Sequence, residues 1–246
     1  MQRKLFIAGG AALLSGCAPI GTALNNSDAV RRVLASAESL DFRFIGTGAA
    51  LAREYPESAV APSFRVNGFA TPSDAVYAGY LASDFATYRL TVDGEVERPL
   101  SLALTDLMRF EQVTQITRHD CVEGWSVIGK WSGVRLGNVI DAAAPKRGAL
   151  FAIFHCMDRD ETGVPYYESL DLVQAHHPQA LLALRLNDRP LDSDHGAPVR
   201  LRVPTQLGYK SAKWVKRIEV TVALRGIGGG HGGYWEDQGY EWYAGI

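Results

Sequence analysis

Alternating apolar and polar positions run through the middle of the chain and predict a sheet-rich domain. The stretch YRLTVDGEVERPLSL (88–102) alternates around Asp93-Gly94, a dipeptide typical of a tight hairpin turn. Further strands are predicted in VTQITRHDC (113–121), GALFAIFHCMD (148–158), LRLNDRPLDSDHGAPVRLRVP (184–204) and the end of GYKSAKWVKRIEVTVAL (208–224). The strand in 113–121 would deliver Cys121 at its end.

Short helices are expected between these strands. SLALTDLMRF (101–110) suits a helix that begins near Thr105 or Asp106. WSGVRLGNVIDAAAP (131–145) suits a turn followed by a helix that stops before Pro145, and SLDLVQAHHPQALLAL (169–184) is helical in its first half. The pattern predicts an α+β fold, a single mixed, mainly β domain with intervening helices.

Changes in texture divide the chain into four parts. These are an export or lipoprotein signal (1–17), a tether (18–59), the folded domain (60–225) and a tail rich in glycine and aromatic residues (226–246). The tether contains a short predicted helix in NNSDAVRRVLASAESL (25–40). The helix of the tether would begin at Ser27 or Asp28.

The N-terminus, MQRKLFIAGGAALLSGC, has two basic residues and an apolar run too short to span a bilayer. Its end resembles a bacterial lipobox in which Cys17 carries the lipid anchor, and a plain signal peptide is the alternative. RKLF also resembles a twin-arginine export signal with Lys4 in place of the second arginine. Either signal would place the domain on the periplasmic side of a bacterial envelope.

Charge and composition give no reason to expect nucleic-acid binding. The formal net charge is -2, from 25 basic and 27 acidic residues, and 47% of the chain is hydrophobic. A charged site must therefore be built locally.

The cysteines leave more than one interpretation open. With Cys17 lipidated, Cys121 and Cys156 remain, and an oxidising compartment would permit a disulfide between them. Alternatively, His119 and Cys121 share one face of a strand and could bind zinc with His155 or Cys156 from a neighbouring strand.

A second cluster is basic. HGAPVRLRVPTQLGYKSAKWVKR contains Arg200, Arg202, Lys210, Lys213, Lys216 and Arg217. Its GYKSAK turn could bind an anion through backbone N–H groups and lysine, although a solvated basic strand edge is the plainer interpretation. A thiol suited to a metal and a turn suited to an anion together favour a cofactor that carries both metal and phosphate.

Three motifs in order, CVEGWS, HGAPVRLRVP and GYKSAKWVKRIEV, resemble the sulfite-oxidase-like molybdopterin-dependent oxidoreductases. The resemblance covers about residues 60–225 and is greatest to small bacterial members such as the periplasmic methionine-sulfoxide reductase catalytic subunit. It implies the sulfite-oxidase molybdopterin-binding fold and a molybdenum-molybdopterin cofactor.

The resemblance also implies roles for individual residues. Cys121 would be the metal ligand and, with Glu123, a catalytic residue. The cofactor contacts would be Asn67, Ala70, Thr71, Cys156, His195, Arg200, Ser211, Ala212 and Lys213. Arg200 and the turn at 211–213 would hold the phosphate end.

The activity implied is oxygen-atom transfer to or from a small sulfite- or sulfoxide-like substrate. Electrons would be exchanged with a separate protein, a cytochrome or haem membrane subunit, because the chain has no C-x-x-C-H haem-attachment motif. Two alternatives stay open: a zinc-dependent hydrolase using Cys121, His119 and His155, and a cofactor-free ligand-binding lipoprotein with a Cys121–Cys156 bridge.

Overall fold

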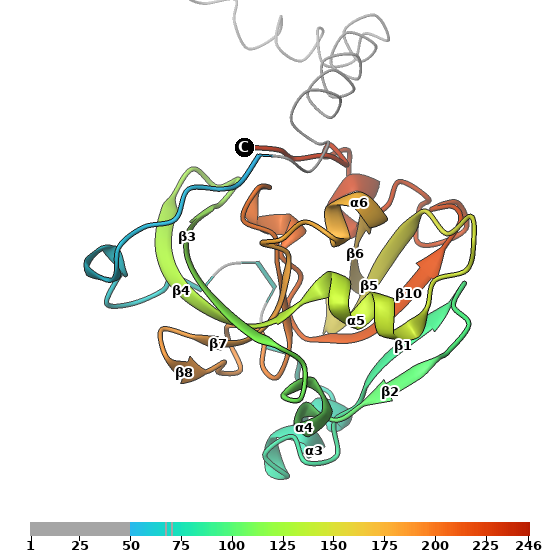
Figure 1. Ribbon diagram of the computed structural model, residues 1–246, viewed down its shortest axis with the longest axis horizontal. Helices are drawn as coiled ribbons and strands as arrows, with labels where there is room; N and C mark the ends of the chain where they lie inside the picture. The colour runs from blue at the N-terminus through green and yellow to red at the C-terminus, as the bar shows by residue number, and fades with distance from the viewer. Residues whose placement is uncertain (1–49, 67, 70) are drawn as a thin grey trace, which may run out of the picture. The chain divides into compact units, whose positions relative to one another are not determined.

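The computed structural model describes residues 50–66, 68–69 and 71–246, which belong to a compact unit spanning Ile45–Ile246 (Figure 1). Its strands are β1 (Leu90–Gly94), β2 (Leu100–Leu102), β3 (Gln112–Asp120), β4 (Ser126–Arg135), β5 (Phe151–Arg159), β6 (Pro165–Asp171), β7 (Leu181–Leu186), β8 (Arg189–Pro190), β9 (Arg200–Arg202) and β10 (Val215–Thr221). Cys17 and the predicted helix in 25–40 lie outside the described residues.

These strands form two sheets. The first has the order β2-β1-β10-β5-β6, and the second has the order β3-β4-β7-β8, with β9 also paired to β7. Short helices connect them: η1 (Glu57–Ala59), α3 (Ala75–Ala82), α4 (Leu104–Leu107), α5 (Leu136–Ala143), α6 (Leu172–Ala175), η2 (Gly208–Lys210) and α7 (Tyr234–Asp237). The α+β, mainly β prediction is confirmed. None of the helices in the described ranges is long and apolar enough to cross a membrane.

The predicted hairpin at 88–102 exists, but its turn is longer than two residues. Leu90 pairs with Leu102, and five residues separate the strand ends at Gly94 and Leu100. Gly94 adopts φ 88°, and a Cβ there would lie 2.2 Å from the carbonyl oxygen of Val220 on the parallel neighbour β10. Glycine is therefore required by the approach of β10 rather than by a two-residue turn.

The prediction of a turn at the start of 131–145 is wrong, because this segment belongs to β4. Gly133, the glycine within the predicted turn, lies inside the strand. A Cβ on Gly133 would lie 2.0 Å from the carbonyl oxygen of Leu182, at a shift in the β4–β7 register. The glycine allows a close approach of two strands at this irregularity.

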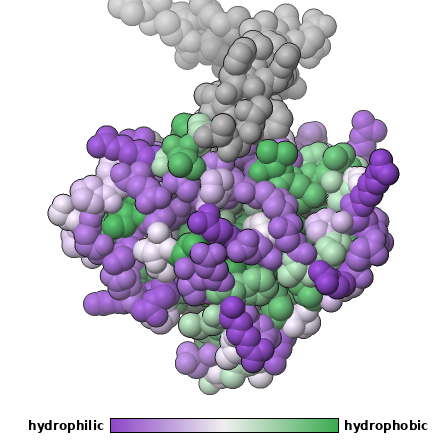
Figure 2. All heavy atoms as spheres, in the orientation of Figure 1, coloured by the Kyte–Doolittle hydropathy of each residue, from purple (hydrophilic) through white to green (hydrophobic). Residues whose placement is uncertain are grey.

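The main core lies where α5 and the first sheet meet. α5 buries Leu136, Val139 and Ile140 completely, and each such side chain contributes about 1.5–3 kcal/mol by leaving water. A second cluster surrounds Trp131 and Phe64, whose rings make an edge contact at 5.1 Å. Figure 2 shows a mostly hydrophilic face with apolar residues in scattered groups.

Both ends of the described chain pack against this domain. The Gln179 side chain exchanges hydrogen bonds with the backbone of Ala52, at 2.8 and 3.0 Å. In the glycine-rich tail, Tyr243 is buried and Gly245 bridges to Gln206. The tail therefore contributes to the domain instead of extending away from it.

Candidate functional site

Cys121 lies in the turn between β3 and β4. Its backbone N–H donates to the Trp125 carbonyl at 2.9 Å, and the Gly124 N–H donates to the Cys121 carbonyl at 3.0 Å. Gly124 has φ 85°, a conformation that glycine adopts without strain. The prediction that a strand delivers Cys121 at its end is confirmed.

Glu123 lies in the same turn, two residues after Cys121. Its side chain is exposed and accepts a hydrogen bond from Trp125 Nε1 at 3.0 Å. Glu123 and Cys121 nevertheless line one cavity.

This cavity has a volume of about 110 Å³. Its walls come from the β3–β4 turn, the ends of β5 and β6, β9 with the η2 turn, and the C-terminal tail. The lining residues are Gly68, Phe69, Cys121, Val122, Glu123, Asp158, Tyr166, Arg200, Gly208, Tyr209, Ser211, Ala212, Lys213, Trp235 and Tyr240. Five predicted site residues besides Glu123 therefore meet here: Cys121, Arg200, Ser211, Ala212 and Lys213.

Arg200 brings hydrogen-bond donors to the cavity. It is 1% exposed, and Nη1 donates to the His195 carbonyl at 3.3 Å. Its Nε and Nη2 have no hydrogen-bond partner among the described residues. Burial lowers the pKa of this guanidinium to about 10. Buried cationic donors of this kind fit an anionic ligand.

Lys213 adds a second cation at the same wall. Its Nζ donates to the carbonyls of Phe69 at 3.0 Å and Asp194 at 3.2 Å. Burial, followed by the nearby Arg200 charge, lowers the pKa of Lys213 to about 7. A phosphate near both cations would favour the protonated amine.

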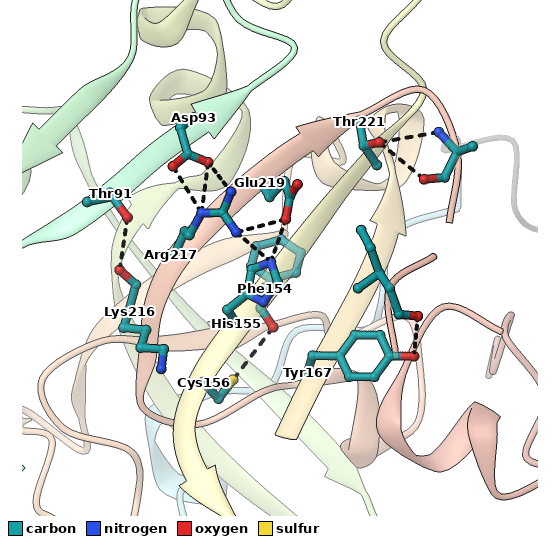
Figure 3. A network of polar contacts seen from close by, with 12 residues as sticks. Thr91, Asp93, Phe154, His155, Cys156, Tyr167, Lys216, Arg217, Glu219 and Thr221 are labelled. Atoms are coloured by element: carbon teal, nitrogen blue, oxygen red, sulfur yellow. Dashed lines mark hydrogen bonds and ion pairs between the residues drawn. The ribbon is translucent and has the colours of Figure 1, made fainter. Parts of the chain in front are cut away.

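Two other members of the basic cluster, Lys210 and Arg217, have carboxylate partners. Lys210 is fully buried and bonded to Glu168 and Glu236, so it is not an anion ligand. Arg217 lies between Asp93 and Glu219 on the first sheet (Figure 3). Its strand, β10, is flanked by β1 and β5, which excludes the interpretation of this strand as a solvated basic edge.

Asp158 is a cavity residue that sequence reasoning missed. It is 3% exposed, and its Oδ1 lacks a hydrogen-bond partner in the described part of the chain. Burial raises its pKa to about 7. The only sequence signal was an acidic residue near the end of a buried strand.

His195 and Thr71 do not line this cavity, and His195 lines a separate groove beside Phe64 and Asp192. The His195 ring contacts Asp192 Oδ1 at 2.7 Å and the Phe64 carbonyl at 3.0 Å, and Thr71 donates to Asp194 Oδ1 at 2.5 Å. Asn67 and Ala70 lie outside the described residues.

Cys156 lines a different groove, between β5, β6 and residues 227–229. Its buried thiol contacts the Phe154 carbonyl at 3.8 Å, and it forms no disulfide with Cys121 in this structure.

The zinc set is not assembled. His155 lies on β5, in the other sheet from His119, where its Nε2 lies 2.8 Å from Glu219 (Figure 3). Burial and then Arg202 and Arg200 hold the pKa of His119 well below its ordinary value. Across the described ranges, no group of three His, Cys, Asp or Glu side chains could hold a metal ion.

The residues present fit a cofactor that carries a metal at one end and a phosphate at the other. A cysteine supplies a soft metal ligand, and the buried donors of Arg200 together with Lys213 suit an anion. The enclosing aromatic walls suit a planar ring system.

Comparisons with known proteins agree with this fit. Residues 78–225 match the family model of the oxidoreductase molybdopterin binding domain. A putative protein-methionine-sulfoxide reductase subunit, YedZ1, of Azospira oryzae is 35% identical over all of this chain and 86% of its own length. The protein-methionine-sulfoxide reductase catalytic subunit MsrP of Campylobacter jejuni is 35% identical over 63% of this chain, which spans 57% of that protein.

The sulfane dehydrogenase SoxCD from Paracoccus pantotrophus has a similar fold, with a TM-score of 0.50 and 24% identity. The match covers 56% of this chain and 39% of the SoxCD chain. From the family match and the relatives together, the chain belongs to the oxidoreductases with a molybdopterin-binding domain and is a molybdenum-molybdopterin enzyme.

Proposed function

We propose that this enzyme reduces the sulfoxide of oxidised methionine, or a similar small sulfoxide, to the thioether. The observation that carries the proposal is the convergence of Cys121, Arg200 and Lys213 on one aromatic-walled cavity. The two relatives named for methionine-sulfoxide reduction, each 35% identical, support the choice of substrate.

Cys121 is the proposed metal ligand, because its turn presents the sulfur to the cavity and a thiolate binds transition metals well. Arg200 and the turn at 211–213 would bind the phosphate end. Ser211 Oγ accepts from the Val203 N–H at 3.2 Å, which fixes this turn against β9. His195 would act on the cofactor by orienting Arg200 through its carbonyl.

Four further contacts stay proposals. Thr71 would position Asp194, whose carbonyl accepts from Lys213. The structure gives no geometry for the proposed contacts of Asn67 and Ala70. Any contact of Cys156 would be indirect, since its side chain lines another groove.

The reaction consumes one sulfoxide, two protons and two electrons, and it releases one thioether and one water. The bound cofactor supplies oxygen-atom transfer with a two-electron change at the metal. Of the protein groups, Asp158 carries a proton up to a pH of about 7 because burial raises its pKa, and Glu123 stands at the exposed side of the cavity. These carboxyls are the proposed proton carriers.

We propose that the enzyme lies on the periplasmic side of a bacterial envelope, anchored by a lipid on Cys17. The twin-arginine route is the proposed means of export. The electrons would come from a separate cytochrome or haem membrane subunit. The supporting pattern, MQRKLFIAGGAALLSGC, lies outside the described residues.

Turnover of free methionine sulfoxide by the cofactor-loaded full chain, with a reduced viologen dye as electron donor, tests the function. The proposal predicts one thioether formed for each two dye molecules oxidised. Sulfite oxidation with an electron acceptor, in the absence of any sulfoxide turnover, would contradict it.

A further inference from the structure

Three buried charged side chains form what we call the ion triad: Glu168 on β6, Lys210 on η2 and Glu236 on α7. They are 0%, 0% and 3% exposed. Lys210 Nζ donates to Glu168 Oε1 and, at 2.6 Å, to Glu236 Oε1. The ion triad therefore joins three segments that are distant in the sequence.

Each member of the ion triad is close in sequence to residues that line the cavity. The member on α7 directly follows Trp235. The member on η2 stands between Tyr209 and Ser211, and the member on β6 comes two residues after Tyr166. A shift of any member would therefore move a cavity wall.

The glycine-rich tail leaves room for these contacts. A Cβ on Gly233 would lie 2.0 Å from Glu236 Oε2 and 2.8 Å from Glu168 Oε1. Beside it, the Ser169 hydroxyl donates to the Gly232 carbonyl. A side chain at position 233 would therefore collide with the carboxyl groups of Glu168 and Glu236 where they contact Lys210.

Charge balance in the ion triad calls for one proton. Two carboxyl groups face one ammonium where none of the three is more than 3% exposed. Burial raises the pKa of Glu168 well above its ordinary value despite Lys210, and Glu236 adds to the rise. The neutral arrangement is one ammonium, one carboxylate and one protonated carboxyl group, with the proton on Glu168.

The wall attached to α7 lies beyond the segment that matches the family, residues 78–225. The rings of Trp235 and Tyr240 stack at 5.2 Å, and Tyr240 makes an edge contact with Tyr209 at 5.4 Å. Tyr209 also donates its hydroxyl to the Glu241 carbonyl at 2.7 Å. The tail thus reaches the cavity through the rings of Trp235 and Tyr240, and its Glu236 is bonded to Lys210 of the ion triad.

We propose that the ion triad is a positioning device that holds Trp235 and Tyr240 at the cavity and so sets how tightly the substrate is bound, without holding the cofactor. The inference rests on the proposed sulfoxide reduction for its substrate. Removing one partner of a buried ion pair can cost about 3–5 kcal/mol of stability. The free energy of unfolding is therefore measured for each variant, so that a positioning role is separated from a stabilising one.

The first test is Lys210→Met in the cofactor-loaded full chain, with Lys216→Met as the matched control. Lys216 is exposed on β10 and belongs to another groove. For Lys210→Met we expect unchanged molybdenum and pterin content, amide exchange in residues 226–246 faster by about tenfold or more, and a KM for methionine sulfoxide raised about tenfold with a smaller change in kcat. The control should match the native protein in all three.

The second test changes the number of carboxyl groups around Lys210. It remains informative if the Lys210→Met variant fails to fold. Glu168→Gln reproduces the protonated partner and should leave exchange and KM within about twofold of native. Glu168→Gln with Glu236→Gln removes both counter-ions and should behave like Lys210→Met. Glu161→Gln, at an exposed loop position, is the control.

Native exchange and KM in both Lys210→Met and the double variant would overturn the inference. So would loss of molybdenum in either, because the ion triad would then hold the cofactor. If the native protein turns over no sulfoxide, the proposed function fails, whereas the exchange of residues 226–246 still decides the positioning role.

Discussion

The His119 ring occupies the space that a side chain on Gly208 would need: a Cβ on Gly208 would lie 2.5 Å from His119 Nε2 and 2.7 Å from Cε1. His119 is fully buried two residues before Cys121, and Gly208 opens the η2 turn at the cavity. The contact therefore sets the distance between the turn that carries the thiol and the turn that carries the anion donors.

Gly208→Ala should disturb this relationship. Adding a methyl group to a well-packed buried contact costs about 1–3 kcal/mol, and here the displaced ring would push the two turns apart. We expect a loss of that size in the free energy of unfolding by urea, together with lower molybdenum content.

The control for this prediction is Gly79→Ala. Gly79 lies inside α3, and a Cβ there meets nothing within 4 Å. Alanine should be neutral or stabilise the protein by about 0.5–1 kcal/mol through helix propensity. Equal losses at both positions would contradict the role given to the His119 contact.

Asp158→Asn should change the pH dependence of stability in the cofactor-free protein. Because the folded-state pKa is raised to about 7, the stability contributed by Asp158 is fully present below its unfolded pKa and is lost as pH rises through about 7. Asparagine has no such loss, so the variant should gain stability relative to the native protein between pH 5 and pH 8. Between pH 5 and the folded-state pKa of about 7, the gain is limited to about 3 kcal/mol, since a tenfold change in proton affinity corresponds to about 1.4 kcal/mol.

Asp160→Asn is a control of opposite sign. Hydrogen bonds, first from Thr162 and also from Tyr234, lower the pKa of Asp160 to about 2. Its stabilising contribution is present above the unfolded pKa and is lost only as pH falls through about 2. Asp160→Asn should therefore destabilise the protein equally at pH 5 and pH 8. Urea unfolding at the two pH values measures both variants, and parallel behaviour of the two would contradict the assignment of Asp158.

Arg200→Met should remove cofactor binding while Arg217→Met does not. Arg200 is buried with unpartnered donors at the cavity, and its loss leaves a bound phosphate without a charged partner. Arg217 is partly exposed and pairs with Asp93 and Glu219 (Figure 3), so its loss should cost about 1 kcal/mol of stability or less. Pterin released by acid from each variant is the measurement, and equal pterin in both would exclude Arg200 as a phosphate ligand.

Sequence reasoning found the parts of the site that have local signals. Alternation placed Cys121 at a strand end, and charge placed Arg200 and Lys213 in a cluster of six basic residues. Their selection from that cluster was implied by the family resemblance, and the structure brings all three residues to one cavity. Lys210 could not be assigned in this way, because charge along a sequence does not show burial. Its partners Glu168 and Glu236 lie 42 and 26 residues away.

The strand β4 was missed for a related reason. Gly133 indicates a turn by itself, and only the approach of the Leu182 carbonyl from β7 explains it as part of a strand. The tail was likewise hard to place, because glycine-rich sequence without periodicity carries no local sign of the contacts that Trp235 and Tyr240 make. Long-range pairing decided both segments.

The most direct test of the central claim is the molybdenum and pterin content of Cys121→Ser beside that of the native full chain, with Cys156→Ala as a thiol control. A hydroxyl is a harder and much weaker ligand than a thiolate for this metal. We predict near-stoichiometric molybdenum and pterin in the native protein and in Cys156→Ala, and a fold retained by circular dichroism but with molybdenum and turnover lost in Cys121→Ser. Full molybdenum content with native turnover in Cys121→Ser would contradict the assignment of Cys121 as the metal ligand.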